Sequence, residues 1–494
     1  MTQPTRLGFN LLFFGIAAVA LGGLAWFLQQ NHFVNDMALR RWATLLEVLD
    51  SPRIRPEYLG LLYPHGTFLA LAPFHYLGPL DSAMAPTLVS VLFGAGLLAL
   101  WSHHLQRAGQ PPVFRILLVG LVVLHPAFLW GATSGSMGAI SLGCFYLLYT
   151  AALRLIIRDD IHSFIVFGVL LAAFFFVEGA SLYLSLALVP LLPLLAPRHI
   201  LMSAPLSTFV ILATPLLVVA FGWFYYNWLF FGTPLAFLQE AHTQLQGSAV
   251  EALPWLRIYG DQCLLPGLWT LGLTLAAFPA MVLLLGGLRQ DSQRLVTALV
   301  LLFHPVVAVC LATEDRFLRH PLELVALVLA GIMAELAYLG PRPARARQGV
   351  VALLALGLFG GWAGFLLYPT PTMEAWRGAF LKPVTAPDHA GEIALGRWLG
   401  RHRGPTLLDD ASGYRAIAAR GDARGLIVPF EDRFQIELRL RQPTVEQVAL
   451  PDPDSMVGLG DALNRRWPDF YQNGKPGYRL VYDYGGWRVW KRDA

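Results

Sequence analysis

Charged residues are scarce in this chain, and their scarcity argues against an ordinary soluble protein. Only 14% of its 494 residues are charged and 56% are hydrophobic, whereas soluble domains are about a quarter charged. Lysine is absent before Lys382, so the first three-quarters of the chain carries isolated arginines between long apolar runs. Several of those runs reach the roughly 20 residues that cross the hydrocarbon core of a bilayer. The sequence therefore predicts a polytopic α-helical membrane protein.

Cysteine and net charge are low as well. The three cysteines, Cys144, Cys263 and Cys310, lie in or beside apolar segments and give neither a disulfide framework nor the spacing of a metal site. The net charge is only +4, and acids interleave with the basic residues, which argues against a nucleic-acid partner. HExxH, GxSxG and Walker motifs are absent, so the motifs of soluble hydrolases and ATPases are missing.

The apolar runs predict about eleven transmembrane helices. The first run, 8–28, is too long for the core of a signal peptide and has no small-residue cleavage site after it, so we expect it to be retained. The others are 83–101, 113–133, 137–157, 163–177, 181–195, 207–228, 264–285, 295–312, 322–338 and 350–368.

The arginines between these runs give the bundle a direction. If the N-terminus is cytoplasmic, every even-numbered span ends at a basic connection, for example at Arg107, Arg158 or Arg294, as the positive-inside rule requires. The long loops 29–82 and 231–262 then lie outside, and an apolar piece of the first loop, 61–77, suits an interfacial helix. We expect a multi-pass membrane protein whose C-terminal domain lies outside.

The composition changes after Pro369. Helical patterns at 390–403 and 455–467 alternate with strand-like runs at 406–408 and 425–430, and two further alternating runs flank Gly485-Gly486 as in a hairpin. The sequence predicts a transmembrane bundle over 1–369 and a small α/β domain over 370–494, a length within the usual range of domains.

The first long outside loop holds candidate catalytic and binding residues. Asp36 follows the first span and precedes a helical pattern, so it is either a general base for an acceptor hydroxyl or, on spacing alone more often, a helix cap. Tyr63-Pro64-His65-Gly66 is either a phosphate-contacting segment near the headgroups or an interfacial turn. Asp50 and Glu57 are further acids of this loop.

Two other places carry charge near the outer surface. Arg316 and Arg319 stand at the outside start of a span, against the positive-inside bias, and indicate either a bound anion or an ordinary loop. Glu178 lies between two short apolar runs, where a carboxylate is a functional candidate unless the loop is simply hydrated.

Several features recur in a fixed order along the chain. An aspartate follows the first span, the segment 63–69 contains proline, and 176–180 reads Phe-Val-Glu-Gly-Ala. The aromatic run 223–235 ends in Phe-Gly-Thr-Pro-Leu, and Arg316-Phe317-Leu318 precedes a later span. This set resembles the GT-C superfamily, whose polytopic glycosyltransferases use polyprenyl-phosphate-linked sugars, and within it the protein mannosyltransferase and aminoarabinose-transferase branch.

The resemblance implies an inverting glycosyltransferase that moves a sugar from a polyprenyl-phosphate donor to a glycan, lipid or protein acceptor at the outer face of the inner membrane. It makes Asp36 the catalytic base or the carboxylate that orients the acceptor. It places Tyr63, His65, Arg316 and Arg319 on the side of the lipid phosphate. It assigns no metal ligands and leaves a divalent metal ion open as the cofactor.

The chain also departs from the family pattern. Tyr-Pro-His stands where relatives carry Lys-Pro-Pro or His-Pro-Pro, and Asp36 has no adjacent acid. These departures motivate the alternative of a non-catalytic GT-C-like scaffold in glycan assembly or export. A transporter fits less well, because the charges cluster in the outside loops rather than within the spans.

Overall fold

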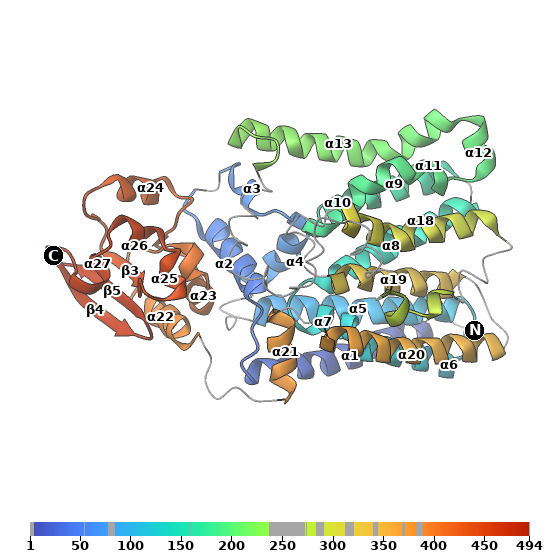
Figure 1. Cartoon of the computed structure of the whole chain (residues 1–494), viewed down its shortest axis with the longest axis horizontal. Coiled ribbons are helices and arrows are strands. Elements are labelled where there is room, and N and C mark those ends of the chain that lie inside the picture. The colour runs from blue at the N-terminus through green and yellow to red at the C-terminus, as the bar shows by residue number, and fades with distance from the viewer. Residues whose placement is uncertain are drawn as a thin grey trace. The chain divides into compact units, whose positions relative to one another are not determined.

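The computed structural model of the protein is mostly helical (Figure 1). It describes residues 4–53, 55–77, 84–158, 160–236, 272, 274–282, 291–311, 321–338, 344–367, 371–381 and 389–493. Most of the predicted span 264–285 and nearly all of the second long loop lie outside these residues, as do Arg316 and Arg319.

Contacts divide the chain into two compact units. The first contains Met1–Phe27, Tyr63–Thr67 and Thr87–Arg377, and the second contains Leu28–Leu62, Phe68–Pro86 and Gly378–Ala494. The predicted division assigned 29–82 to the bundle, whereas the contacts group most of this loop with the C-terminal residues. The reason is a set of ion pairs and helix contacts between the loop and residues beyond 388, described below.

Five helices among the described residues are long and apolar enough to cross a membrane. They are α1 (Pro4–Gln30), α5 (Met84–Arg107), α8 (Gly138–Arg158), α13 (Pro205–Phe231) and α20 (Ala344–Leu367). Shorter apolar helices pack with them: α9 (Ile161–Phe175), α10 (Gly179–Leu188) with η1 (Val189–Leu191) and α11 (Leu192–Leu195), α18 (Ser292–Leu311) and α19 (Pro321–Tyr338). The first unit is thus a helical bundle of the membrane type.

The predicted span 113–133 is two helices rather than one. α6 (Pro112–Leu124) and α7 (Pro126–Thr133) meet at a bend of 70°, and they add a sixth candidate span only if the bent pair crosses as one. Pro126 lacks an N–H and disfavours helical backbone at His125, which breaks the ladder. The indole Nε1–H of Trp362 donates to the carbonyl of Leu124 at 3.1 Å and satisfies an acceptor at the break.

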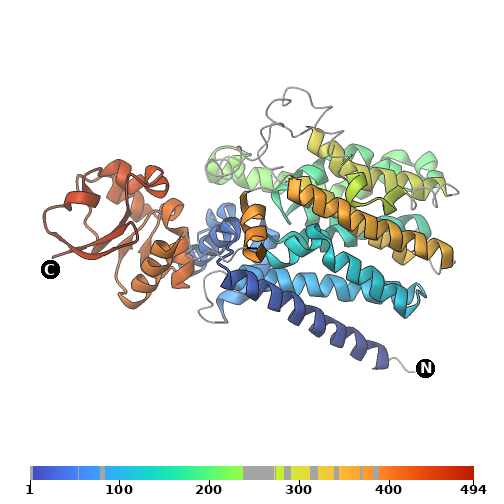
Figure 2. The ribbon, with the colours of Figure 1, turned by 60° about the horizontal axis from the view of Figure 1, so that its bottom comes forward.

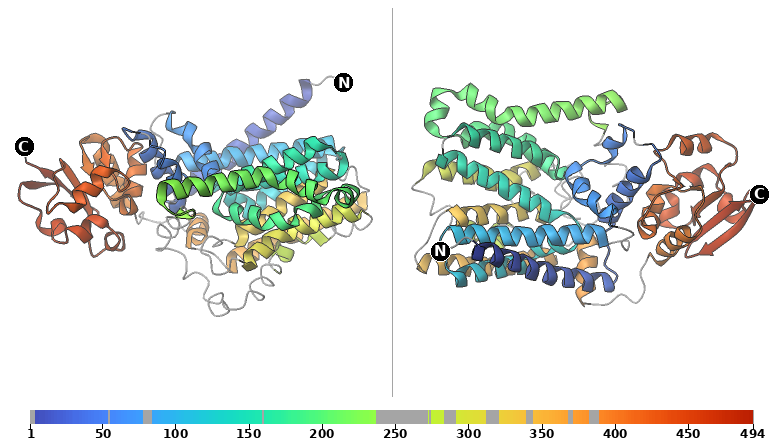
Figure 3. Two further views of the ribbon diagram at one scale, coloured as in Figure 1. Left: turned by 90° about the horizontal axis from the view of Figure 1, so that it is seen from above. Right: turned by 180° about the vertical axis from the view of Figure 1, so that it is seen from behind.

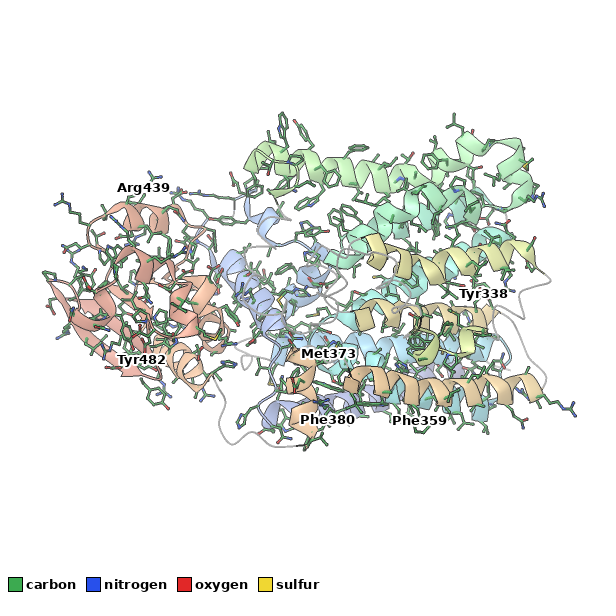
Figure 4. The ribbon with its side chains drawn as sticks, viewed as in Figure 1. Tyr338, Phe359, Met373, Phe380, Arg439 and Tyr482 are labelled. Carbon is green, nitrogen blue, oxygen red and sulfur yellow. The ribbon has the colours of Figure 1, made fainter. Side chains whose placement is uncertain are left out.

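The bundle has a basic end. α13 packs on α9, α9 on α8, α8 on α19 and α19 on α18, with α1 and α13 at opposite edges (Figure 2). Four basic stretches of the sequence lie at one end of the bundle (Figures 1 and 3). They are the N-terminus of α1, the α5–α6 connection, α12 (Arg198–Ser203) and the start of α20. Phe359 of α20 is exposed and lies on the outer edge of the bundle (Figure 4), as a lipid-facing residue does.

A buried charge pair joins helices of the bundle. An Nη2–H of Arg294, in α18, donates to Oε2 of Glu335, in α19, at 2.7 Å. The hydroxyl of Tyr149, in α8, donates to the other carboxylate oxygen at 3.0 Å. Both oxygens of Glu335 are therefore occupied, which is how a charge in such a place is tolerated.

In the second unit, the first loop forms the amphipathic helix α2 (Asp36–Asp50). Asn35 caps it, because its side-chain oxygen accepts the N–H of Ala38 at 3.3 Å. One face of α2 is buried and includes Leu39, Trp42 and Leu46. The short helix α3 (Tyr58–Leu61) follows it. The predicted interfacial piece 61–77 is mostly α4 (His65–His75), whose first residues belong to the first unit.

The C-terminal part of the second unit contains a mixed sheet. Its strands are β1 (Thr406–Leu407), β2 (Leu426–Ile427), β3 (Gln447–Pro451), β4 (Tyr478–Tyr484) and β5 (Trp487–Arg492), in the order β2-β1-β3-β5-β4. β1 is parallel to β2 and β3, and β5 is antiparallel to β3 and β4. The β4–β5 hairpin turns at Gly485 and Gly486, both at positive φ, as the sequence predicts.

Helices complete this part of the unit. They are α21 (Pro371–Leu381), which begins in the first unit, α22 (Ala390–Arg401), α23 (Asp410–Arg420), α24 (Asp432–Arg439), α25 (Met456–Leu459), α26 (Ala462–Arg466) and α27 (Phe470–Asn473). The predicted helix 455–467 is instead α25 and α26, because Asp461 caps a new start by accepting the N–H of Asn464 at 2.8 Å. The core includes Leu407, Val448, Leu450, Trp467 and Phe470.

Candidate functional site

Three of the sequence segments singled out above meet in the first unit. The ring of Tyr63 stacks on Trp223 of α13 with 5.7 Å between centroids. The ring of His65 lies edge-on to Trp223 at 4.6 Å and to Phe176 at 4.9 Å. Trp223 also stacks on Tyr226 at 5.1 Å. We call Tyr63, His65, Phe176, Trp223 and Tyr226 the aromatic cluster.

Backbone contacts hold this cluster together. The N–H of Gly66 donates to the carbonyl of Phe176 at 2.8 Å, and the hydroxyl of Tyr63 donates to the carbonyl of Phe175 at 3.4 Å. A Cβ on Gly66 would lie 3.0 Å from the Cα of Val177 and 3.1 Å from the carbonyl oxygen of Phe176. The start of α4 therefore approaches the end of α9 at a distance that only glycine allows without movement.

Gly66→Ala is expected to lower the stability of the full chain by about 1–3 kcal/mol, as overpacking does in a filled site. The neighbouring atoms belong to the backbone, so a side-chain rotation cannot relieve the contact. The measurement is the melting temperature of the purified protein in detergent. Gly143→Ala in α8 is the matched control, because its Cβ meets nothing within 4 Å. Equal melting temperatures for Gly66→Ala and wild type would contradict the close approach.

Glu178 and Asn227 border the cluster in the chain. Glu178 is the N-cap residue of α10, and its N–H donates to Oγ of Ser181 at 2.9 Å, so this acid starts a helix. Asn227, within the aromatic run, is fully buried and donates to the carbonyl of Trp223 at 2.8 Å. The aromatic cluster thus joins four aromatic rings and the imidazole of His65 in the first unit.

Asp36 takes part in a second cluster, in the second unit. It is the first residue of α2, and its carboxylate is held by Arg415 of α23. Nε–H of Arg415 donates to Oδ1 at 3.0 Å and Nη2–H donates to Oδ2 at 2.7 Å. The Asp36 side chain is still 47% exposed, whereas that of Arg415 is only 13% exposed. A bidentate fork of this kind fixes the plane of the carboxylate as well as its position.

Arg415 has two further partners: Glu392 on α22 and His389, the residue that precedes α22. Nη1 of Arg415 lies 2.6 Å from Nδ1 of His389 and 3.4 Å from Oε1 of Glu392. The ring of Tyr414 lies under the guanidinium groups of Arg40 and Arg415, at 4.9 Å and 5.3 Å. Burial, and then the negative charge of Asp36, raise the pKa of Tyr414 to about 12.

Of the other acids predicted in the first loop, Asp50 has structural contacts. Asp50, whose side chain is 2% exposed, accepts the N–H of Ala423 at 2.9 Å and Nε–H of Arg424 at 3.2 Å. Nε2 of His75 lies 3.5 Å from the same carboxylate. Glu57 occupies the N-cap position of α3 without a capping hydrogen bond from its side chain.

A group of buried acids lies on α2 and at the start of α23, two helices that pack together. Glu47 of α2 is buried, and neither carboxylate oxygen has a hydrogen-bond partner among the described residues. Burial, and then the charges of Asp410 and Asp409, raise the pKa of Glu47 well above its usual value. Burial and Asp409 likewise raise the pKa values of Asp410 and Asp461 to about 7.

Asp409 itself is used for capping. Its Oδ1 accepts the N–H of Ala411 at 3.0 Å, at the start of α23, and its Oδ2 accepts the N–H of Ala462 at 2.6 Å, at the start of α26. One carboxylate therefore accepts backbone N–H groups at the starts of two helices. Among the described residues, no three or more His, Cys, Asp or Glu side chains are arranged to hold a metal ion.

The structure brings Tyr63 and His65 together with Phe176 and Trp223 in one unit, and Asp36, Asp50 and Glu57 occur in the other. The residue that sequence reasoning missed is Arg415. No local pattern marks it, because its partner Asp36 is 379 residues away. Glu47 was missed as well, since a single acid on an amphipathic helix reads as an exposed position.

The fold and these clusters define the class: a helical membrane protein with an aromatic cluster in one compact unit and an acid–arginine cluster in the other. A scan against models of known protein families and a search of curated proteins both find no match.

Proposed function

We propose that this protein is a GT-C-type glycosyltransferase that moves a sugar from a polyprenyl phosphate to an acceptor hydroxyl. The observation that carries the proposal is the aromatic cluster. Segments 63–69, 176–180 and 223–235 resemble the family in sequence and are far apart along the chain. The rings of Tyr63, His65, Phe176 and Trp223 nevertheless pack on one another. If the three segments had unrelated structural roles, nothing would require them to pack on one another.

The proposed chemistry balances with the groups described. The acceptor oxygen attacks the anomeric carbon of the sugar, the bond from that carbon to the phosphate oxygen breaks, and polyprenyl phosphate leaves with the electron pair. The acceptor proton passes to Asp36 as general base. The ion pair with Arg415 uses one lone pair on each oxygen of Asp36. A carboxylate has about four such sites, and Asp36 is 47% exposed, so capacity for a hydroxyl remains.

The donor side of the proposal uses Tyr63, His65, Arg316 and Arg319. The two aromatic side chains are half-buried in the aromatic cluster, where a ring face stacks on a sugar and an imidazole contacts a phosphate. The arginines supply positive charge for the leaving phosphate, and they lie outside the described residues. The acceptor in this proposal is a glycan, a lipid or a protein hydroxyl.

We place the bundle in a bacterial inner membrane with about eleven spans and a cytoplasmic N-terminus. The basic connections gather at the end of the bundle where α1 begins (Figures 1 and 3). Trp26 near the end of α1, and Tyr225 and Trp228 near the end of α13, are exposed, as residues of an interfacial aromatic belt are. In this orientation the domain over 370–494 is periplasmic.

Asp36→Asn is expected to lower turnover at least about 100-fold, the usual contribution of a general base. The assay uses the full chain in proteoliposomes with polyprenyl-phosphate monosaccharides, and it measures released polyprenyl phosphate, a product common to every sugar and acceptor. Arg424→Gln is the control, because it breaks an ion pair with the same helix at Asp50 and leaves Asp36 untouched. Wild-type turnover by Asp36→Asn would overturn the proposed role.

A second candidate, a non-catalytic scaffold, has one observation in its favour. The ion pair between Asp36 and Arg415 also joins α2 to α23, so the carboxylate has a structural use without any reaction. This candidate predicts that the wild-type protein binds polyprenyl phosphate and releases none from any sugar-linked donor. Turnover by the wild-type protein rules it out.

A further inference from the structure

We infer that Arg415 is the positioning residue of the site: it aims the exposed part of the Asp36 carboxylate at the acceptor. The inference rests on the proposed function and adds a residue from the C-terminal half of the chain to its machinery. It also makes α23 and α22, through Arg415, His389 and Glu392, part of what sets the geometry of the base.

The first argument is the geometry of the pair. Guanidinium is planar and offers its N–H groups in a fixed fork, so two parallel bonds to one carboxylate set the orientation of both planes. Arg415 makes those two bonds to Oδ1 and Oδ2 of Asp36. With the inner lone pairs used, the lone pairs on the far side of the carboxylate face away from Arg415.

The second argument is how Arg415 itself is held. Its remaining terminal nitrogen contacts Nδ1 of His389 and Oε1 of Glu392, and its side chain is mostly buried. Arginine only donates hydrogen bonds, so Nδ1 of His389 accepts and carries no proton. The groups that face this assembly are Asp36 and Arg40 from α2, Glu392 from α22 and Tyr414 from α23.

The third argument compares two ion pairs that both join α2 to the C-terminal part of the second unit. Arg424 and Asp50 also join α2 to the C-terminal part, but there the acid is 2% exposed and the arginine is 70% exposed. In the Arg415–Asp36 pair the arginine is the buried member, at 13%, and the acid is the exposed member, at 47%. An ion pair that only fastens two segments has no need to present its carboxylate to solvent, and Arg415 presents that of Asp36.

The test compares Arg415→Gln, Arg415→Lys and the matched control Arg424→Gln in the full chain. Arg415→Gln is expected to lower kcat about 10- to 100-fold with little change in KM, because a misplaced base affects the reacting geometry. Arg415→Lys keeps the charge without the fork and is expected to fall between Arg415→Gln and wild type. Arg424→Gln is expected to keep kcat near wild type.

The comparison of the two arginine variants separates positioning from fastening, because each removes one ion pair between α2 and the C-terminal residues. His389→Gln keeps an acceptor for Nη1 of Arg415 and is expected to keep kcat near wild type. Equal kcat in Arg415→Gln, Arg424→Gln and wild type would overturn the inference and leave the proposed function standing.

A measurement without turnover separates the two failures. Carbodiimide modification of the full chain, followed by mass spectrometry of the peptide that carries Asp36, is expected to show faster labelling in Arg415→Gln than in wild type and unchanged labelling in Arg424→Gln. If the wild-type protein never turns over a donor, the proposed function fails, and faster labelling still shows that Arg415 orients Asp36. Unchanged labelling in Arg415→Gln overturns the inference in either case.

Discussion

Glu335→Leu, with Arg294 left in place, is expected to destabilise the helical bundle by about 3–5 kcal/mol, the cost of leaving a buried charge without its partner. Glu335 is fully buried, and Arg294 is 14% exposed at 2.7 Å from it. The substitution also removes the acceptor of the Tyr149 hydroxyl. The measurement is the melting temperature of the full chain in detergent, followed by intrinsic fluorescence.

The matched control for that variant removes both charges. The double substitution Arg294→Met with Glu335→Leu is expected to recover most of the lost stability, because replacing a whole buried pair by apolar side chains is often neutral or stabilising. If the double variant melts as low as Glu335→Leu alone, the loss comes from packing or from Tyr149 rather than from an uncompensated arginine.

Glu47→Gln is expected to raise the melting temperature at pH 8 and to change it little at pH 4. The pKa of Glu47 is raised in the folded protein by burial and by Asp410 and Asp409. A carboxyl with a raised folded-state pKa favours folding below its usual value of 4.5 and costs stability as pH rises through the window up to the folded-state pKa. An amide that never ionises avoids that cost.

Asp432 is the control of opposite sign, since Arg55 lowers its pKa. Asp432→Asn is expected to cost stability at pH 8 and to cost nothing only once pH lies below the lowered folded-state pKa. A Glu47→Gln protein less stable than wild type at pH 8 would contradict the assignment.

The helices of the first unit were predictable where a single uninterrupted apolar run has the length of a membrane span. α5, α8, α13 and α20 lie within a few residues of the predicted spans. The bend between α6 and α7 was not predicted, because hydropathy averages over Pro126 while the backbone does not. In the same way, the predicted helix 455–467 missed the cap at Asp461.

The candidate site was predictable as segments and not as contacts. The sequence placed Tyr63, His65 and the aromatic run in an order that resembles a family, and the packing of those rings on Trp223 follows from tertiary structure alone. Asp36 is not the N-cap residue of α2, because its neighbour Asn35 provides the cap. Arg415 was out of reach, because an ion pair across 379 residues leaves no periodic signal.

The grouping of the first loop with the C-terminal residues has a consequence for synthesis. Asp36 leaves the ribosome 379 residues before Arg415, and at about 5–20 residues per second that interval lasts roughly 20–75 s. During it, the face of α2 that carries Leu39, Trp42 and Leu46 lacks the partner that buries it in the finished protein. The second unit is therefore the last part of the molecule to assemble, and a chain shortened at its C-terminus leaves its first loop without a folded partner.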